Sequence, residues 1–268
     1  MINDTSKEFI KRHIGPSEED IDSMLKVVGA NSLDDLIKKT VPNNILLKDK
    51  LKIGDPTSEH ESMKQIKVIS EKNKLYTNYI GMGYYNTYMP NVVLRNIYCN
   101  PGWYTAYTPY QPEVAQGRLE MLLNFQQMVL DFTGMDIANA SLLDESTAAA
   151  EAIGLSRRLD KNNSNKVFIS RDCNPQTIDV IKTRTEVFGL KLVVGDQEKD
   201  LKSIEGNVIC GVFQYPGTLG DINDPSEAIS KIHKKNGKAI LVCDLLALAK
   251  LKTPAELGAY IAVGNSQR

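Results

Sequence analysis

The run Ala239-Ile240-Leu241-Val242-Cys243-Asp244 has five apolar residues followed directly by an acid. A short apolar run of this kind is typical of a strand that is buried on both faces of a sheet. Runs of the same character recur along the second half of the chain, with helical patterns between them: strands at residues 166–170, 191–195, 208–215 and 260–263, and helices at residues 176–188 and 224–236. This alternation predicts an α/β domain with a mostly parallel sheet and helices on both faces.

The first 75 residues carry three short helix patterns. Each begins at a serine, Ser17, Ser32 or Ser58, with an acid three residues later. A serine hydroxyl at this place caps the free N–H groups of a helix start. Gly29 follows the first pattern, where glycine commonly ends a helix. We therefore expect a small helical extension over residues 1–75 and one large domain over residues 76–268.

Residues 76–110 have an unusual composition. Nine of the eleven tyrosines and the single tryptophan, Trp103, lie there, and three prolines interrupt the segment. It predicts a long ordered loop with a short helix at about residues 91–98. The aromatic side chains favour a packed core or an interface. A platform for stacking nucleic acid bases is disfavoured, because Arg95 is the only cation of the segment and backbone phosphates require positive charge.

The composition excludes several classes of protein. The formal net charge is −1, from 32 basic and 33 acidic residues, so no general attraction to nucleic acid or to an anionic membrane is expected. No run approaches the roughly 20 apolar residues of a membrane span, and residues 1–14 resemble neither a signal nor a transit peptide. The four cysteines and three histidines are scattered, which disfavours a zinc site. We expect a cytoplasmic protein.

Two features point to chemistry at the carboxyl ends of the strands, where open parallel sheets bind ligands. Asp244 ends the strongest strand, and it would pair with a ligand or, as the more common alternative, cap a turn. After a helix over residues 113–132, Ser146-Thr147 precede an alanine run, so a second helix start there offers N–H groups and hydroxyls to a phosphate. Both signals are weak alone, and the residues by themselves do not specify a reaction.

Longer motifs give a resemblance. The chain carries a series of them in one order: Phe9-Ile10-Lys11-Arg12-His13-Ile14-Gly15-Pro16, Gly81-Met82-Gly83-Tyr84-Tyr85-Asn86-Thr87-Tyr88-Met89-Pro90, Asn100-Pro101-Gly102-Trp103-Tyr104-Thr105-Ala106-Tyr107-Thr108-Pro109-Tyr110-Gln111, Gln116-Gly117-Arg118-Leu119-Glu120, and Asn139-Ala140-Ser141-Leu142-Leu143-Asp144-Glu145. This series closely resembles the N-terminal half of the glycine cleavage system P-protein, from about residue 8 to Arg268. So many long motifs in one order make the resemblance highly specific.

The resemblance implies a function. P-proteins resemble the fold-type I enzymes that use pyridoxal phosphate, and they are oxidoreductases of glycine catabolism. They decarboxylate glycine and pass the remaining aminomethyl group to the lipoyl arm of H-protein. The implied partners are therefore glycine, lipoylated H-protein and the catalytic C-terminal half of the P-protein, and the implied cofactor is pyridoxal phosphate, which serves as an electron sink.

The resemblance also assigns positions. The catalytic half carries a His-Lys-Thr motif whose lysine holds the cofactor, and Gln267 stands at the corresponding place here. Glutamine forms no Schiff base, so this half is expected to be inactive alone, with the cofactor bound by the other half. Asp244 matches the acid that faces the pyridine nitrogen, and Ser146-Thr147 match the phosphate turn. All of these are expected to be vestigial here.

The motif density suggests where this half acts. Five polar and aromatic residues are candidates for the side of the shared active site: Tyr107, Thr108, Tyr110, Gln111 and Glu113. Packing between the two halves is an equally good interpretation of them. The resemblance further implies that the large domain is incomplete, because P-proteins continue past this point through a glycine-rich segment.

The role of the chain within such an enzyme has two open interpretations. The chain is either a working component of the decarboxylase or a scaffold half that only binds and stabilises the catalytic half. A self-sufficient pyridoxal phosphate enzyme of another family is disfavoured, because Lys250 and Lys252 lie too close in sequence to Asp244 for a cofactor lysine on another strand.

Overall fold

The computed structural model describes residues 12–49, 51–139 and 141–268. The chain divides into two compact units, Met1–Thr77 and Asn78–Arg268. Four residues of the quoted motifs, Phe9, Ile10, Lys11 and Ala140, lie outside the described residues.

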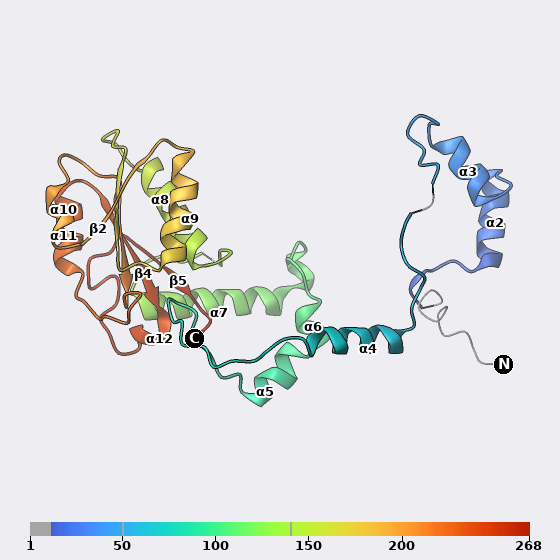
Figure 1. The fold of residues 1–268 in the computed structure, drawn as a ribbon, viewed down its shortest axis with the longest axis horizontal. Coiled ribbons are helices and arrows are strands. Elements are labelled where there is room, and N and C mark those ends of the chain that lie inside the picture. The colour runs from blue at the N-terminus through green and yellow to red at the C-terminus, as the bar shows by residue number, and fades with distance from the viewer. Residues whose placement is uncertain (1–11, 50, 140) are drawn as a thin grey trace. The chain divides into compact units, whose positions relative to one another are not determined.

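The first unit contains helices α2 (Glu18–Val28), α3 (Leu33–Thr40) and α4 (Glu59–Ser70) (Figure 1). The predicted starts are confirmed, because Ser17, Ser32 and Ser58 each cap the backbone N–H three residues on. Gly29 ends α2 with a φ of 75°, a left-handed conformation that glycine adopts at little cost. Local capping chemistry therefore sets the bounds of these helices.

The second unit opens with short helical turns, in keeping with the helix predicted near residues 91–98. They are α5 (Asn91–Val93), the π-helical turn η2 (Leu94–Tyr98), α6 (Pro101–Tyr104) and the 3-10 turn η3 (Pro112–Val114). The long helix α7 (Gln116–Thr133) follows and ends at Gly134. Its predicted start at residue 113 is wrong, because residues 112–114 form a separate turn and Ala115 leaves the helical conformation.

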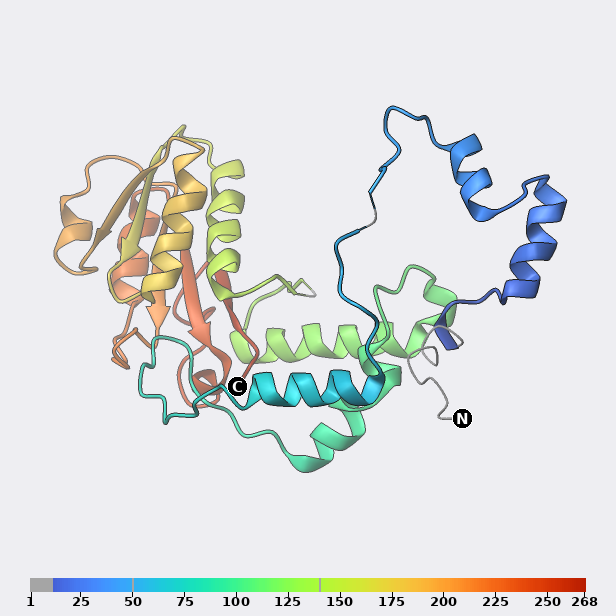
Figure 2. The same cartoon turned by 45° about the vertical axis from the view of Figure 1, so that its right-hand side comes forward.

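All five predicted strands form one parallel sheet in the order β2-β1-β3-β4-β5 (Figures 1 and 2). Their bounds match the predictions closely: β1 Lys166–Ser170, β2 Lys191–Gly195, β3 Cys210–Tyr215, β4 Lys238–Asp244 and β5 Ile261–Asn265. Because the strands are parallel, all their carboxyl ends lie at one edge of the sheet. Asp244 pairs with Asn265 in the register there.

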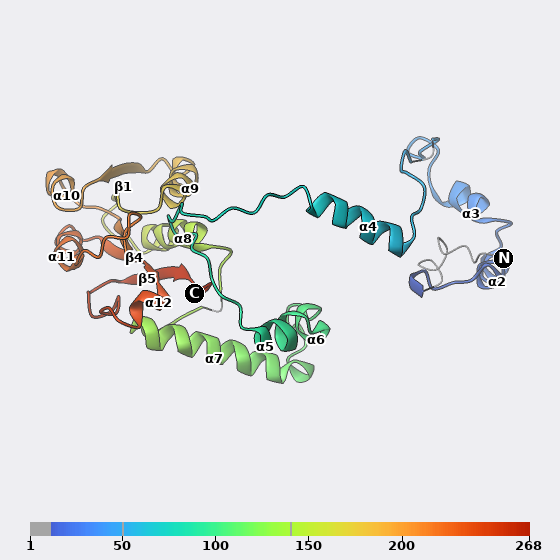
Figure 3. The same ribbon diagram turned by 60° about the horizontal axis from the view of Figure 1, so that its bottom comes forward.

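Helices cover both faces of the sheet, as expected (Figure 3). One buried cluster joins the sheet to α8 (Glu145–Arg158) and α9 (Pro175–Glu186). The other joins it to α10 (Asp200–Ser203), α11 (Ser226–Lys234) and α12 (Leu245–Leu248). Phe168 and Phe213 lie in the second cluster, fully buried, with ring centroids 5.9 Å apart. Across the described residues, none of the helices combines the length and the apolar character that a bilayer crossing needs.

Two short elements differ from the expectations. The sequence also predicts a short helical turn at Ala255–Gly258, but the structure has hydrogen-bonded turns there without a helix. α12 was not predicted, and it starts because Asp244 caps the N–H of Leu246. Helices of four residues carry too little periodicity to be read from sequence.

Candidate functional site

A polar cavity of about 280 Å³ lies at the carboxyl edge of the sheet. Its walls come from the ends of β3, β4 and β5, from the starts of α8 and α9, and from the loop at residues 83–85. Its polar side chains are Glu145, Asn174, Gln214, Asp244, Asn265, Gln267 and Arg268. This is the edge where parallel sheets bind their ligands, so we take it as the candidate site of this half.

Asp244 has two partners in this cavity. Its Oδ1 accepts a hydrogen bond from the N–H of Leu246, and its Oδ2 lies 2.5 Å from Nη2 of Arg268. Asp244 thus caps a helix, the common role foreseen for an acid at a strand end, and also neutralises a guanidinium. Both oxygens of this carboxylate therefore have partners inside the chain.

The predicted start of α8 is displaced from its true position. The residue that caps this helix is Asp144, two residues earlier than Ser146, and its Oδ1 accepts from the N–H of Thr147 at 2.7 Å. The hydroxyl of Thr147 bonds back to Asp144, and that of Ser146 lies 3.0 Å from Oγ1 of Thr177. The structure therefore uses both predicted hydroxyls internally, and a carboxylate occupies the helix start where a phosphate would bind.

Glu145 is the second carboxylate at the start of α8, and the sequence analysis did not select it. Burial raises the pKa of Glu145, while hydrogen bonds from Asn174 Nδ2 at 3.1 Å and Gln214 Nε2 at 3.5 Å act in the opposite direction. These amides come from the start of α9 and from β3. The only available signal was the polar character of Gln214 within an apolar strand.

Gln267 lies at the mouth of the cavity. Its Nε2 donates to the carbonyl oxygen of Tyr85 at 3.1 Å, and its N–H donates to Asn265 Oδ1 at 2.7 Å. The neighbouring Arg268 places its guanidinium 4.8 Å from the centroid of the Tyr85 ring. Gln267 is thus a hydrogen-bond donor at the place that the resemblance gives to a lysine.

The described residues of this edge do not fit pyridoxal phosphate. None of the residues lining the cavity is a lysine, so nothing there forms a Schiff base. The acid is paired with Arg268, and the start of α8 carries Asp144 and Glu145 in place of free phosphate donors. A phosphate dianion beside two carboxylates would meet like charges. No step of the reaction is therefore assigned to a cofactor in this half.

The five candidate active-site residues form a separate, exposed group between α6 and α7. All are exposed, and the rings of Tyr107 and Tyr110 lie 6.4 Å apart. The group lies at the end of α7 away from α12 (Figures 1 and 3), and a helix of 18 residues is roughly 27 Å long. Thr108, Gln111 and Glu113 are neighbours of these tyrosines in the chain and are exposed like them. None of the five residues lines the strand-end cavity.

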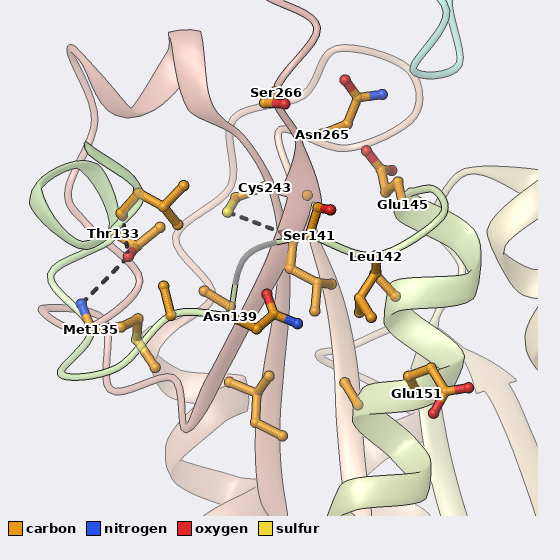
Figure 4. Close-up of a pocket in the computed structure, with 18 of the residues that line it drawn as sticks. Thr133, Met135, Asn139, Ser141, Leu142, Glu145, Glu151, Cys243, Asn265 and Ser266 are labelled. Carbon is orange, nitrogen blue, oxygen red and sulfur yellow. Dashed lines mark hydrogen bonds between the residues drawn. The ribbon is translucent and has the colours of Figure 1, made fainter. Parts of the chain in front are cut away.

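A larger cavity of about 730 Å³ runs along β5 between α7 and α8 (Figure 4). Its walls are mostly apolar, with Leu142, Ile261 and Val263 among them, and Glu145 stands at the end that it shares with the polar cavity. Cys243 also lines it, but burial raises the pKa of this thiol to about 12 and its Sγ donates to the carbonyl of Val263. The thiol of Cys243 is therefore not an activated nucleophile.

Within residues 12–49, 51–139 and 141–268, no group of three or more His, Cys, Asp or Glu side chains is arranged to hold a metal ion. All four cysteines are free of disulfides, with Cys99 exposed and the other three buried.

Comparison with known proteins agrees with the resemblance. The chain is 70% identical over 268 residues to the glycine dehydrogenase (decarboxylating) of Pelagibacter ubique (strain HTCC1062), and 52% identical over 271 residues to that of Nostoc punctiforme. Both alignments cover 100% of this chain but 28% of the relative. The chain thus spans somewhat more than a quarter of the length of these relatives.

Solved structures agree with the fold. A crystal structure of glycine decarboxylase (P-protein) of the glycine cleavage system, in inhibitor-bound form, aligns with a TM-score of 0.83 and 32% identity, over 94% of this chain and 57% of that one. A sphingosine-1-phosphate lyase of Burkholderia pseudomallei aligns with a TM-score of 0.50 and 11% identity, over 74% of this chain and 49% of that one, which supports the fold alone. The parallel α/β domain is the large domain of fold-type I.

Sequence and fold thus converge on one family. The sequence model described as "Glycine cleavage system P-protein" matches residues 11–268, nearly the whole chain. By this match the chain belongs to the glycine cleavage system P-protein family.

Proposed function

We propose that this chain is a component of a glycine decarboxylase. In this proposal it works with the catalytic half of the P-protein in the decarboxylation of glycine and in the transfer of the aminomethyl group to the lipoyl arm of H-protein. The observation that carries the proposal is the family match over residues 11–268, together with the 70% identity to a glycine dehydrogenase (decarboxylating). Pyridoxal phosphate, bound by the other half, supplies the electron sink.

The residues at the strand-end edge indicate what this half contributes to the enzyme. Gln267 stands where a lysine is needed, and Asp244 is paired with Arg268. This half therefore contributes surface rather than covalent chemistry. The exposed segment with Tyr107 and Tyr110 is the part we assign to the shared active site, where aromatic rings exclude water and hydroxyls orient the substrate.

A reconstitution experiment tests the proposal. The chain is added to an isolated catalytic half with glycine and lipoylated H-protein, and release of CO2 from the glycine carboxyl group is measured. Rescue of CO2 release supports a working component. Binding without rescue supports the second candidate, a scaffold half, which the lack of a lysine in the cavity also favours. Neither binding nor rescue would refute both.

Alanine at Tyr107 or Tyr110 tests the site assignment in the complete enzyme. Both rings are more than three-quarters exposed in this half, so their removal leaves its own packing intact. If they shape the active site, we expect kcat/KM for glycine to fall by about tenfold or more, since small misplacements of substrate are costly. Tyr76→Ala, at a ring that is 81% exposed and lies outside residues 78–114, is the matched control. Full activity of both variants, with assembly intact, would reject the assignment.

The cellular location stays a prediction from sequence. We propose the cytoplasm, on the basis of the scattered cysteines. Fractionation of the native source, followed by detection of the protein, tests it.

A further inference from the structure

We infer that the strand-end edge of this half has become a clasp for the chain's own loop at residues 81–85. The clasp consists of Gln176, Asn174, Gln267 and Arg268, and it holds the loop in the place where a catalytic half would hold its cofactor. Through the loop it positions the aromatic segment that follows, and this second part of the inference rests on the function proposed above.

Two side-chain amides bind the backbone of the loop. Nε2 of Gln176, in α9, donates to the carbonyl oxygen of Met82 at 2.6 Å. Nε2 of Gln267, just after β5, donates to the carbonyl oxygen of Tyr85 at 3.1 Å. These partners are 94 and 182 residues apart in sequence, so the contacts are tertiary and fix the loop against the edge of the sheet.

The conformation of the loop agrees with an imposed shape. Gly81, Met82 and Gly83 have φ values of 66°, 53° and 87°, three consecutive left-handed residues. Met82 adopts this region at a cost that surrounding contacts must offset. A Cβ on Gly83 would lie 2.6 Å from Nδ2 of Asn174, so only glycine allows the loop to approach this closely.

Arg268 completes the clasp with charge. Its guanidinium is held by Asp244 at 2.5 Å and lies over the Tyr85 ring at 4.8 Å from the centroid. The two charged side chains are 30% and 20% exposed, so the pair is largely shielded from solvent. A ring, a cation and an aspartate thus meet in the polar cavity, all supplied by this chain.

The aromatic segment lies between two anchored elements, the clasped loop and helix α7. At one end the clasp fixes residues 81–85. At the other, the final turn of α7 is fixed to the large domain, where the N–H of Ala255 donates to the carbonyl of Thr133 at 3.2 Å. Tyr88, Tyr98, Tyr107 and Tyr110, which lie between these ends, are 69–100% exposed. The clasp is therefore a positioning device for the surface that we assign to the shared active site.

The test uses the intact P-protein that contains this chain. Gln267→Met keeps the size of the side chain and removes the donor, Arg268→Met removes the charge, and Arg268→Lys keeps the charge as the conservative control. Amide hydrogen exchange of residues 78–90 and 98–114 is followed by mass spectrometry. We expect Gln267→Met, which loses one hydrogen bond to the loop, to exchange roughly fivefold faster there. Arg268→Met loses the cation over the Tyr85 ring and should exchange roughly twofold to fivefold faster, and Arg268→Lys should stay near the parent.

Kinetics give the second measurement. If binding of glycine needs the positioned segment, KM for glycine rises by the factor by which the competent fraction falls, with kcat at saturation unchanged. Absorbance of the bound cofactor and the melting temperature should stay at parent values. A variant that is merely less stable would change the last two and would not produce the split between KM and kcat.

The outcomes distinguish a failure of the clasp from a failure of the proposed function. Unchanged exchange of residues 78–90 in both Met variants would overturn the clasp, whatever the activity of the enzyme. Faster exchange with unchanged KM would overturn its positioning role. Failure of the proposed function shows elsewhere, as a chain that neither rescues nor binds a catalytic half, and it leaves the exchange result intact.

Discussion

Strand β3 and the segment at residues 78–114 both carry large apolar side chains, but they use them in opposite ways. Phe213 in β3 is fully buried between the sheet and its helices, whereas Tyr88 in the segment is 100% exposed. Isolated exposed apolar residues are ordinary, but a continuous series of them marks an interaction surface. The sheet buries its apolar side chains within this chain, whereas the segment leaves its aromatic side chains exposed. The difference teaches which part is built for stability and which for a partner.

The largest expected effect is in the sheet. Phe213→Ala removes a ring that is 0% exposed and contacts Phe168 across neighbouring strands. The lost transfer free energy and the cavity left behind should lower the free energy of unfolding by about 3–5 kcal/mol. Urea unfolding of the 268-residue chain, followed by circular dichroism, measures it.

Tyr88→Ala is the counterpart in the exposed segment. Its removal should change the free energy of unfolding by no more than about 0.5 kcal/mol, because an exposed ring makes little packing in this chain. Equal losses for Tyr88→Ala and Phe213→Ala would abolish the contrast between the two regions, and the segment would then belong to the core.

The same contrast explains how well the sequence predicted the fold. Strands β1 and β2 lie at the predicted residues, because strands covered on both faces are written as continuous apolar and β-branched runs. Strand β5 is displaced by only one or two residues from the expected 260–263. The family resemblance, carried by long motifs in the exposed segment and outside it, led to the proposed function, which the core pattern does not encode.

Helix starts in the large domain were harder to predict. The prediction placed the start of α8 at Ser146-Thr147, since serine and threonine are good caps, but Asp144 takes the cap and Thr147 completes a capping box. α6 was missed because Pro101 was taken as an interruption, whereas proline is well suited to the first turn of a helix. Several capping residues in a row leave the choice to tertiary contacts.

The candidate site was predictable only in part. Asp244 and Gln267 lie at the strand-end edge, where the strand pattern and the resemblance indicate them. The contact of Gln267 with Tyr85 joins residues 182 positions apart, and no local pattern contains it. The burial of Glu145 likewise depends on how α8 packs against α9 and β3. Contacts between distant elements carry no periodicity, so they appear only in the folded chain.

A smaller loss of stability is expected at the cap of α8, a helix that packs on the sheet. Asp144→Ala removes the acceptor for the N–H of Thr147 and should cost about 1 kcal/mol in urea unfolding. Asp144→Asn keeps an acceptor and should lose much less. If the alanine variant is as stable as the parent, the carboxylate does not serve as the cap, and the helix start would again be available to an anion.

The smallest effect concerns the charge of Glu145, at the border between the core and the cavity. Because burial raises its pKa above the unfolded value, the folded state binds more protons than the unfolded state between the two values. Stability from this group is therefore fully present below the unfolded pKa of about 4.3 and is lost as pH rises through the raised value. Glu145→Gln does not titrate, yet it keeps an oxygen that accepts from Asn174 and Gln214.

We therefore expect Glu145→Gln to gain stability relative to the parent as pH rises from about 4 to about 7, by a modest shift of the urea midpoint. Glu186→Gln, at an exposed position of α9, is the same substitution outside the cavity and serves as the comparison. A parent that is more stable than Glu145→Gln at neutral pH would mean that the amides from Asn174 and Gln214 outweigh burial. The ionised carboxylate would then stabilise the fold, and its hydrogen bonds at the edge of the sheet would fully compensate for its burial.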